Sequence, residues 1–144
     1  MKYKILIVSS NYYKVISKNL LRSAIESLKE KAETKIIEVP GSFEIPVIIS
    51  RNISEYDGFI ALGCIIKGET PHFGFISQSI TNAIMELSIN FKKPIGNGII
   101  TSLNKDQALI RSYKKGIEAA EATLTVLDKF EWELYIREKI TQEL

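Results

Sequence analysis

Four short apolar runs, each rich in Ile and bounded by Gly, Pro or polar residues, recur along this chain. They span residues 3–8 (YKILIV), 34–39 (TKIIEV), 58–66 (GFIALGCII) and 95–101 (IGNGIIT). Their length and composition are typical of buried β-strands. Between them lie stretches with one apolar residue every three or four positions, the spacing of an amphipathic helix. Because a crossover that holds a helix joins parallel strands, this order predicts a parallel sheet covered by helices on both faces.

The helical stretches present apolar faces at Ile16, Leu20, Ala24 and Leu28, at Phe73, Ile76, Ile80, Ile84 and Leu87, and at Ile117, Ala120, Leu124 and Leu127. We therefore expect residues 1–144 to form one three-layer α/β domain. Residues 128–144 form a mixed-charge tail that also contains Phe130, Trp132, Leu134, Tyr135 and Ile136. So many apolar side chains predict that the tail packs against another surface.

Composition narrows the classes of function. The 144 residues contain one cysteine, Cys64, and one histidine, His72, and carry a net charge of +2. We therefore expect no disulfide framework, no metal site and no nucleic-acid partner, and the single thiol favours a reducing, cytoplasmic setting. The longest apolar run, residues 59–66, is too short for a membrane span, and no signal peptide is expected at the start. The G-x-x-x-x-G-K-[ST] and G-x-G-x-x-G nucleotide motifs are also absent.

Ligands of open α/β sheets bind at the carboxyl ends of the strands, so the loops there are the candidate site. The first carries Tyr12 and Tyr13, which either pack at the sheet edge or stack on a flat heterocycle. In the second, Gly41 permits a tight turn, Ser42 is the predicted helix cap, and Glu44 falls in the first helical turn. Glu44 either complements the helix dipole or binds a polyhydroxyl ligand.

The third loop contains a strong helix-start signal. Thr70 is the predicted N-cap and Pro71 the first helical residue, so the preceding Lys67 and Gly68 would stand beside free amides that suit an anion. His72 follows, where a group that titrates near neutral pH could transfer protons. The local sequence around Arg111, Lys114 and Lys115 indicates only charged side chains on the solvated face of a helix.

Taken in order, the segments ILIVSSNYY, VPGSFEIP, LGCIIKGETPHF, GNGIITSLNKDQA and KKGIEAAEA resemble the 6,7-dimethyl-8-ribityllumazine synthase family over residues 4 to 128. The resemblance implies a flavodoxin-like fold with a four-stranded parallel sheet. It implies the condensation of 5-amino-6-(D-ribitylamino)uracil with L-3,4-dihydroxy-2-butanone 4-phosphate, with loss of phosphate and water and without a cofactor. It also implies a homo-oligomer, a pentamer or a multiple of pentamers, with active sites at subunit interfaces and riboflavin synthase as a further partner.

The resemblance also implies roles for individual residues. Tyr12 would stack on the pyrimidine, Ser42 and Phe43 would lend backbone groups, and Glu44 would bind the ribityl hydroxyls. The pyrimidine edge would lie against Cys64, Ile65 and Ile66. Lys67, Gly68, Glu69 and Thr70 would hold the phosphate, with Arg111 reaching it from a neighbouring subunit, and His72 would transfer protons. Asn97 would come from the neighbour, and Lys115 matches the lysine of the family's last long helix.

Several positions depart from the family pattern. Tyr12 replaces Phe or Trp, Asn11 stands where arginine is common, and Gly74 replaces a frequent aspartate. Lys67 replaces an arginine, which keeps the charge but loses bidentate phosphate geometry, and Asn97 stands where phenylalanine is frequent. Two alternative functions are an archaeal-type riboflavin synthase, which would act on lumazine alone, and a non-catalytic flavin-binding module. The loop of Glu69, Thr70, Pro71 and His72, together with Arg111, favours the lumazine synthase reaction over both alternatives.

Overall fold

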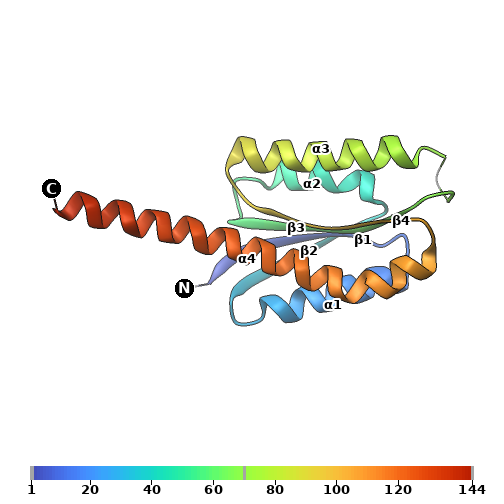
Figure 1. Cartoon of the computed structure of the whole chain (residues 1–144), viewed down its shortest axis with the longest axis horizontal. Coiled ribbons are helices and arrows are strands. Elements are labelled where there is room, and N and C mark those ends of the chain that lie inside the picture. The colour runs from blue at the N-terminus through green and yellow to red at the C-terminus, as the bar shows by residue number, and fades with distance from the viewer. Residues whose placement is uncertain (1, 70, 144) are drawn as a thin grey trace.

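The computed structural model describes residues 2–69 and 71–143, which form a parallel sheet between two layers of helices (Figure 1). The elements are β1 (Tyr3–Ser10), α1 (Lys14–Leu28), β2 (Ala32–Val39), η1 (Ser42–Glu44), α2 (Ile45–Arg51), β3 (Gly58–Ile66), α3 (Phe73–Phe91), β4 (Ile95–Ser102) and α4 (Lys105–Glu143). All neighbouring strands are parallel, in the order β2-β1-β3-β4. In Figure 1, α2 and α3 cover one face, and α1 and α4 cover the other. The predicted three-layer, four-stranded α/β fold is confirmed.

The centre of the sheet is buried because helices cover both of its faces, whereas the edge strand β2, expected to be buried, is mostly half-buried or exposed. Every residue of the central strand β3 is buried, and so are the last six of β1. Strands covered on both faces are continuous apolar runs, as in the segments 3–8 and 58–66. Alternate residues of β1 enter different cores: Ile5 and Ile7 pack with Leu20 of α1, whereas Leu6 packs with Ile84 of α3.

The register brings the strand ends to a common edge. Ser10 pairs with Val39, Ser9 with Leu62, and Ile66 with Ser102. The loops after all four strands therefore leave the sheet on the same side, where the candidate site was expected.

Two predicted helix starts need correction. The helix expected from Pro71 begins at Phe73, with His72 in the cap position. A tight turn precedes it, in which the Glu69 N–H donates to Ile66 O and Gly68 has a φ of 87° that favours glycine. Pro71 and His72 complete the change of direction, so the first helical bond runs from Ile76 N–H to His72 O. The predicted cap, Thr70, lies outside the described residues.

Ser42 is not a helix cap either. It is the first residue of η1, Gly41 holds the cap position in an extended conformation, and no side chain makes a capping hydrogen bond there. The turn therefore starts one residue before the predicted position, and the Ser42 side chain is buried. Glu44 does fall in the first turn, as predicted.

The tail is helical, and only its first residues contact the rest of the chain: Asp128 accepts a hydrogen bond from the Tyr3 hydroxyl, and Phe130 lines a groove beside Pro94. α4 continues to Glu143 and projects past the sheet (Figure 1). Trp132, Leu134 and Tyr135 are half-exposed, and Trp132 stacks on Tyr135. For these three side chains, residues 2–69 and 71–143 do not provide the expected packing surface. No helix in this part of the chain combines the length and apolar character that crossing a membrane requires.

Candidate active site

A pocket of about 220 Å³ opens at the carboxyl ends of β1 and β3. Its walls come from the loop after β1, the turn after β2, the end of β3, the following loop and the first turn of α3. The lining residues are Tyr12, Tyr13, Gly41, Ser42, Phe43, Cys64, Ile65, Ile66, Glu69 and Ile76. Seven of these, Tyr12, Ser42, Phe43, Cys64, Ile65, Ile66 and Glu69, are predicted site residues, although they are far apart in the sequence.

Aromatic side chains stand at the pocket mouth. Tyr12 is 66% exposed and Phe43 is 65% exposed, so each offers a free ring face. The Tyr12 ring leans on Tyr13, with centroids 4.8 Å apart and planes at 52°. An exposed ring supported from behind is suited to stacking on a flat heterocycle.

The Ser42 hydroxyl is a polar group without a partner in the pocket wall. Ser42 is only 7% exposed, and its Oγ makes no hydrogen bond within the described structure. A Cβ on Gly63 of β3 would collide with that oxygen, so glycine is what lets η1 approach the sheet. Because buried polar groups are normally hydrogen-bonded, this hydroxyl is a ready contact for a bound ligand.

Cys64 is a neutral thiol at physiological pH. Burial and the nearby negative charge of Glu69 raise its pKa to about 11, while Arg111 acts in the opposite direction. The thiol is therefore not an activated nucleophile, and Cys64 serves as wall of the pocket.

The remaining predicted residues surround the pocket without lining it. Glu44 is half-buried, with Oε1 folded over Gly41, 3.2 Å from where a Cβ would stand. Lys67, Gly68 and His72 are exposed in and after the turn that follows β3. Lys115 lies one helical turn beyond Arg111 on α4, and both line a shallow depression on that helix.

Arg111 reaches back to the sheet of its own chain. Its Nη1 donates to Thr101 O at 3.1 Å, close to the carboxyl end of β4. Since Ile66 and Ser102 are paired, that end lies beside the end of β3. The guanidinium is therefore at the same sheet edge as the pocket.

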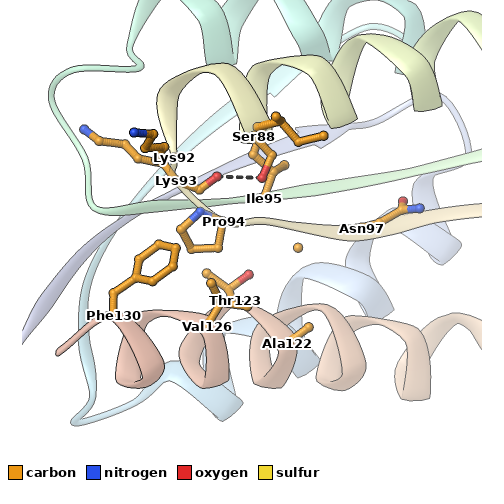
Figure 2. A pocket seen from close by; sticks show the side chains of 12 residues that line it. Ser88, Lys92, Lys93, Pro94, Ile95, Asn97, Ala122, Thr123, Val126 and Phe130 are labelled. Carbon is orange, nitrogen blue, oxygen red and sulfur yellow. Dashed lines mark hydrogen bonds between the residues drawn. The ribbon is translucent and has the colours of Figure 1, made fainter. Parts of the chain in front are cut away.

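Asn97 belongs to a different cavity. It lines a groove of about 440 Å³ between β4, the end of α3, and α4, where Pro94 and Phe130 also stand (Figure 2). Its Oδ1 accepts a hydrogen bond from Ile99 N–H at 3.0 Å. Asn97 pairs with Ala61, three positions before Cys64, so it is separated from the pocket of its own chain. Within residues 2–69 and 71–143, no three His, Cys, Asp or Glu side chains gather as metal ligands would.

The sequence analysis assigned Gly41 to a turn and Ile76 to a helix face, but neither of them, nor Gly63, to the site, and it left Tyr13 between two interpretations. Gly63 interrupts a buried apolar strand, a pattern that often marks a close backbone approach. Tyr13 could be recognised only through its partner, because its hydroxyl donates to Glu69 Oε2 at 2.6 Å across 56 residues of sequence.

Comparison with known proteins gives one consistent result. The sequence model of the family described as 6,7-dimethyl-8-ribityllumazine synthase matches residues 2–131. A protein of that name from Bartonella tribocorum is 41% identical over 134 residues, covering 88% of this chain and 89% of its own. The Agrobacterium fabrum protein of that name is 40% identical over 139 residues, with 88% and 94% covered. The Renibacterium salmoninarum protein is 35% identical over 119 residues, with 81% and 73% covered. With the fold and the strand-end pocket already in agreement, these matches establish that the chain belongs to the 6,7-dimethyl-8-ribityllumazine synthase family.

Proposed function

We propose that this chain condenses 5-amino-6-(D-ribitylamino)uracil with L-3,4-dihydroxy-2-butanone 4-phosphate to give 6,7-dimethyl-8-ribityllumazine, phosphate and water. The observation that carries the proposal is the convergence of Tyr12, Ser42 and the Cys64–Ile66 strand end on one pocket, in a chain whose relatives are named for this product.

The pyrimidine would occupy the pocket itself. Tyr12 supplies an exposed stacking face, and the unpaired Ser42 hydroxyl supplies a polar contact. Ser42 and Phe43 begin η1, where the first backbone N–H groups have no partner in the turn. Glu44 stands just outside, over Gly41, where its carboxylate could accept hydrogen bonds from the ribityl hydroxyls.

The phosphate would bind beside the turn after β3. Lys67 and Gly68 are exposed there, and Thr70 follows outside the described residues. Arg111 supplies a second positive charge at the same sheet edge. Arg111 does not line the pocket of its own chain but a separate depression on α4, so we propose that it reaches the phosphate bound by a neighbouring subunit, as the family resemblance implies.

The chemistry needs orientation more than strong acids or bases. An aromatic amine attacks a ketone, an imine forms with loss of one water, phosphate leaves, and the ribitylamino nitrogen closes the ring onto a carbonyl with loss of a second water. Holding the two substrates in a reactive geometry can supply much of the barrier reduction. His72 is exposed at the start of α3, on the side of the proposed phosphate site, and would assist the proton transfers.

Family membership supports an oligomeric enzyme with small-molecule substrates, and we propose a pentamer or a multiple of pentamers in the cytoplasm. The pocket of about 220 Å³ is smaller than the roughly 300 Å³ or more of most ligand sites, as expected if a neighbour completes it. Large apolar side chains remain uncovered on the isolated chain, including Phe75 at 79% and Ile110 at 82% exposure.

Asn97 would approach the neighbour's site, and Lys115 would support the charge of Arg111. Riboflavin synthase, which consumes lumazine, is the proposed partner outside the homo-oligomer.

The test is to incubate the purified protein with both substrates and follow lumazine fluorescence. We expect product only when both are present. Conversion of lumazine alone into riboflavin would instead support the riboflavin synthase alternative, and binding of flavin without turnover would support the binding module.

The role of Arg111 across the interface is tested by co-expressing Arg111→Ala and His72→Ala chains, and we expect activity well above the average of the two single variants. If both residues serve one subunit, no site in a mixed oligomer has both, and activity stays at the average of the two single variants. Recovery well above that average would show that Arg111 acts across the interface.

A further inference from the structure

One hydrogen bond crosses the pocket between two loops that are distant in sequence. The Tyr13 hydroxyl, from the loop after β1, donates to Glu69 Oε2, from the turn after β3, at 2.6 Å. Both residues line the pocket, together with Tyr12 and Cys64. The bond therefore fixes where the Glu69 carboxylate lies relative to a bound ligand.

Tyr13 is held firmly enough to act as a fixed donor. It caps α1, where its carbonyl accepts the Ser17 N–H at 2.9 Å, and its ring packs against the core on the α1 side of the sheet. Tyr12 contacts one side of the ring, and Lys105 Nζ lies 5.6 Å from the ring centroid. Burial and the bond to Glu69 raise the pKa of Tyr13, so the hydroxyl keeps its proton at neutral pH.

The Glu69 carboxylate can accept further hydrogen bonds beyond the one from Tyr13. Tyr13 occupies Oε2, and a carboxylate can accept several hydrogen bonds. Over residues 2–69 and 71–143, no Lys, Arg or His nitrogen lies within salt-bridge distance of Glu69. Its negative charge reaches the pocket, since it contributes to the raised pKa of Cys64. A free anionic acceptor repels a phosphate and suits a neutral ligand that carries N–H donors.

We infer that Glu69 is a recognition residue for the pyrimidine substrate, accepting a hydrogen bond from its 5-amino group, and that Tyr13 is the positioning residue that orients the carboxylate. This inference rests on the proposed function and refines it, because it moves the Glu69 side chain from the phosphate to the amine. The lysine and the backbone of the same turn remain available to the phosphate.

The test is to titrate wild type and Glu69→Gln with two ligands, 6-(ribitylamino)uracil and its 5-amino counterpart. The glutamine oxygen can still accept from Tyr13, but its amide N–H would face the amine donor. We expect Glu69→Gln to weaken binding of the 5-amino ligand about tenfold, with little change for the ligand that lacks the amine. Equal losses for both ligands, or no loss for either, would overturn the role of Glu69.

Tyr13→Phe removes only the hydroxyl and tests the positioning role. We expect a several-fold higher KM for the pyrimidine, a nearly unchanged KM for the butanone phosphate, and no additional loss when it is combined with Glu69→Ala. Tyr113→Phe is the matched control, because Tyr113 makes the same kind of bond to Glu26 at 2.5 Å, in the contact between α1 and α4. Additive effects of Tyr13→Phe and Glu69→Ala, or equal effects of Tyr13→Phe and Tyr113→Phe, would overturn the positioning role.

Failure of the underlying function gives a different result. If wild type neither binds the ribityl pyrimidines nor forms lumazine, the proposed function is wrong. If wild type does both and the variants behave like wild type, only the Tyr13–Glu69 inference is wrong.

Discussion

Replacing Gly116 by alanine should separate the two helices that cover one face of the sheet. A Cβ at this position of α4 would overlap the Ser23 hydroxyl and the Leu20 carbonyl oxygen of α1, with the Leu20 carbonyl carbon at 3.2 Å. The serine can rotate away, but the backbone carbonyl cannot, so α1 and α4 must move apart. Arg111, five residues earlier on α4, would move with it.

The magnitude follows from two opposing effects. Overpacking a buried contact costs about 1–3 kcal/mol, and the rigid carbonyl points to the upper end. Alanine is a better helix former than glycine by about 1 kcal/mol, which offsets part of that cost. The net loss is about 2 kcal/mol, and for a chain of this size Tm should fall by about 4–8 °C.

The assay is thermal unfolding at one fixed protein concentration, because assembly affects Tm. Gly74→Ala is the matched control: it also lies in a helix, but nothing stands within 4 Å of its Cβ position, so it should gain about 0.5 kcal/mol. Adding Ser23→Ala to Gly116→Ala should recover only part of the loss, since the carbonyl overlap remains. A Gly116→Ala protein as stable as wild type would refute the packing argument.

Three further predictions concern the site. His72→Ala should lower kcat by about 10²-fold at most and leave binding of a ribityl pyrimidine unchanged, because orientation supplies much of the barrier reduction; an unchanged kcat would assign His72 a structural role. Glu44→Ala should weaken binding of the ribityl compound by about 1.5–3 kcal/mol, and an equal loss for the compound without its ribityl chain would contradict this role. Alkylation of Cys64 by iodoacetamide should be slow at neutral pH and accelerate as the pH approaches the thiol pKa of about 11; rapid reaction at neutral pH would show that the thiolate is already present.

The local pattern of the chain was enough to predict the layers of the fold. The run at 58–66 matches β3 at both ends, and Ile16, Leu20, Ala24 and Leu28 are all buried in α1. Both results have the same cause. A helix covered on one face carries apolar residues every three or four positions, a strand covered on both faces is a continuous apolar run, and both patterns are visible in the sequence. Loops at the carboxyl ends of parallel strands share one edge, which made the loops of Tyr12 and Ser42 candidates for one site, whereas the place of Cys64 in that site was implied only by the family resemblance.

What the sequence did not determine depends on contacts between distant segments. The pairing of Ile66 with Ser102 brings the end of β4, where Arg111 bonds to Thr101 O, beside the end of β3, and no local signal on α4 reports that register. The bond from Tyr13 to Glu69 joins two loops that only the assembled sheet brings within 2.6 Å. The start of α3 at Phe73 depends on the turn at Gly68, which outweighed the local preference of proline for the first helical position. Residues 128–143 continue α4 because they contain no glycine or proline that would break the helix. Which surface covers their apolar side chains depends on contacts outside the helix, and the sequence of the helix does not specify those contacts.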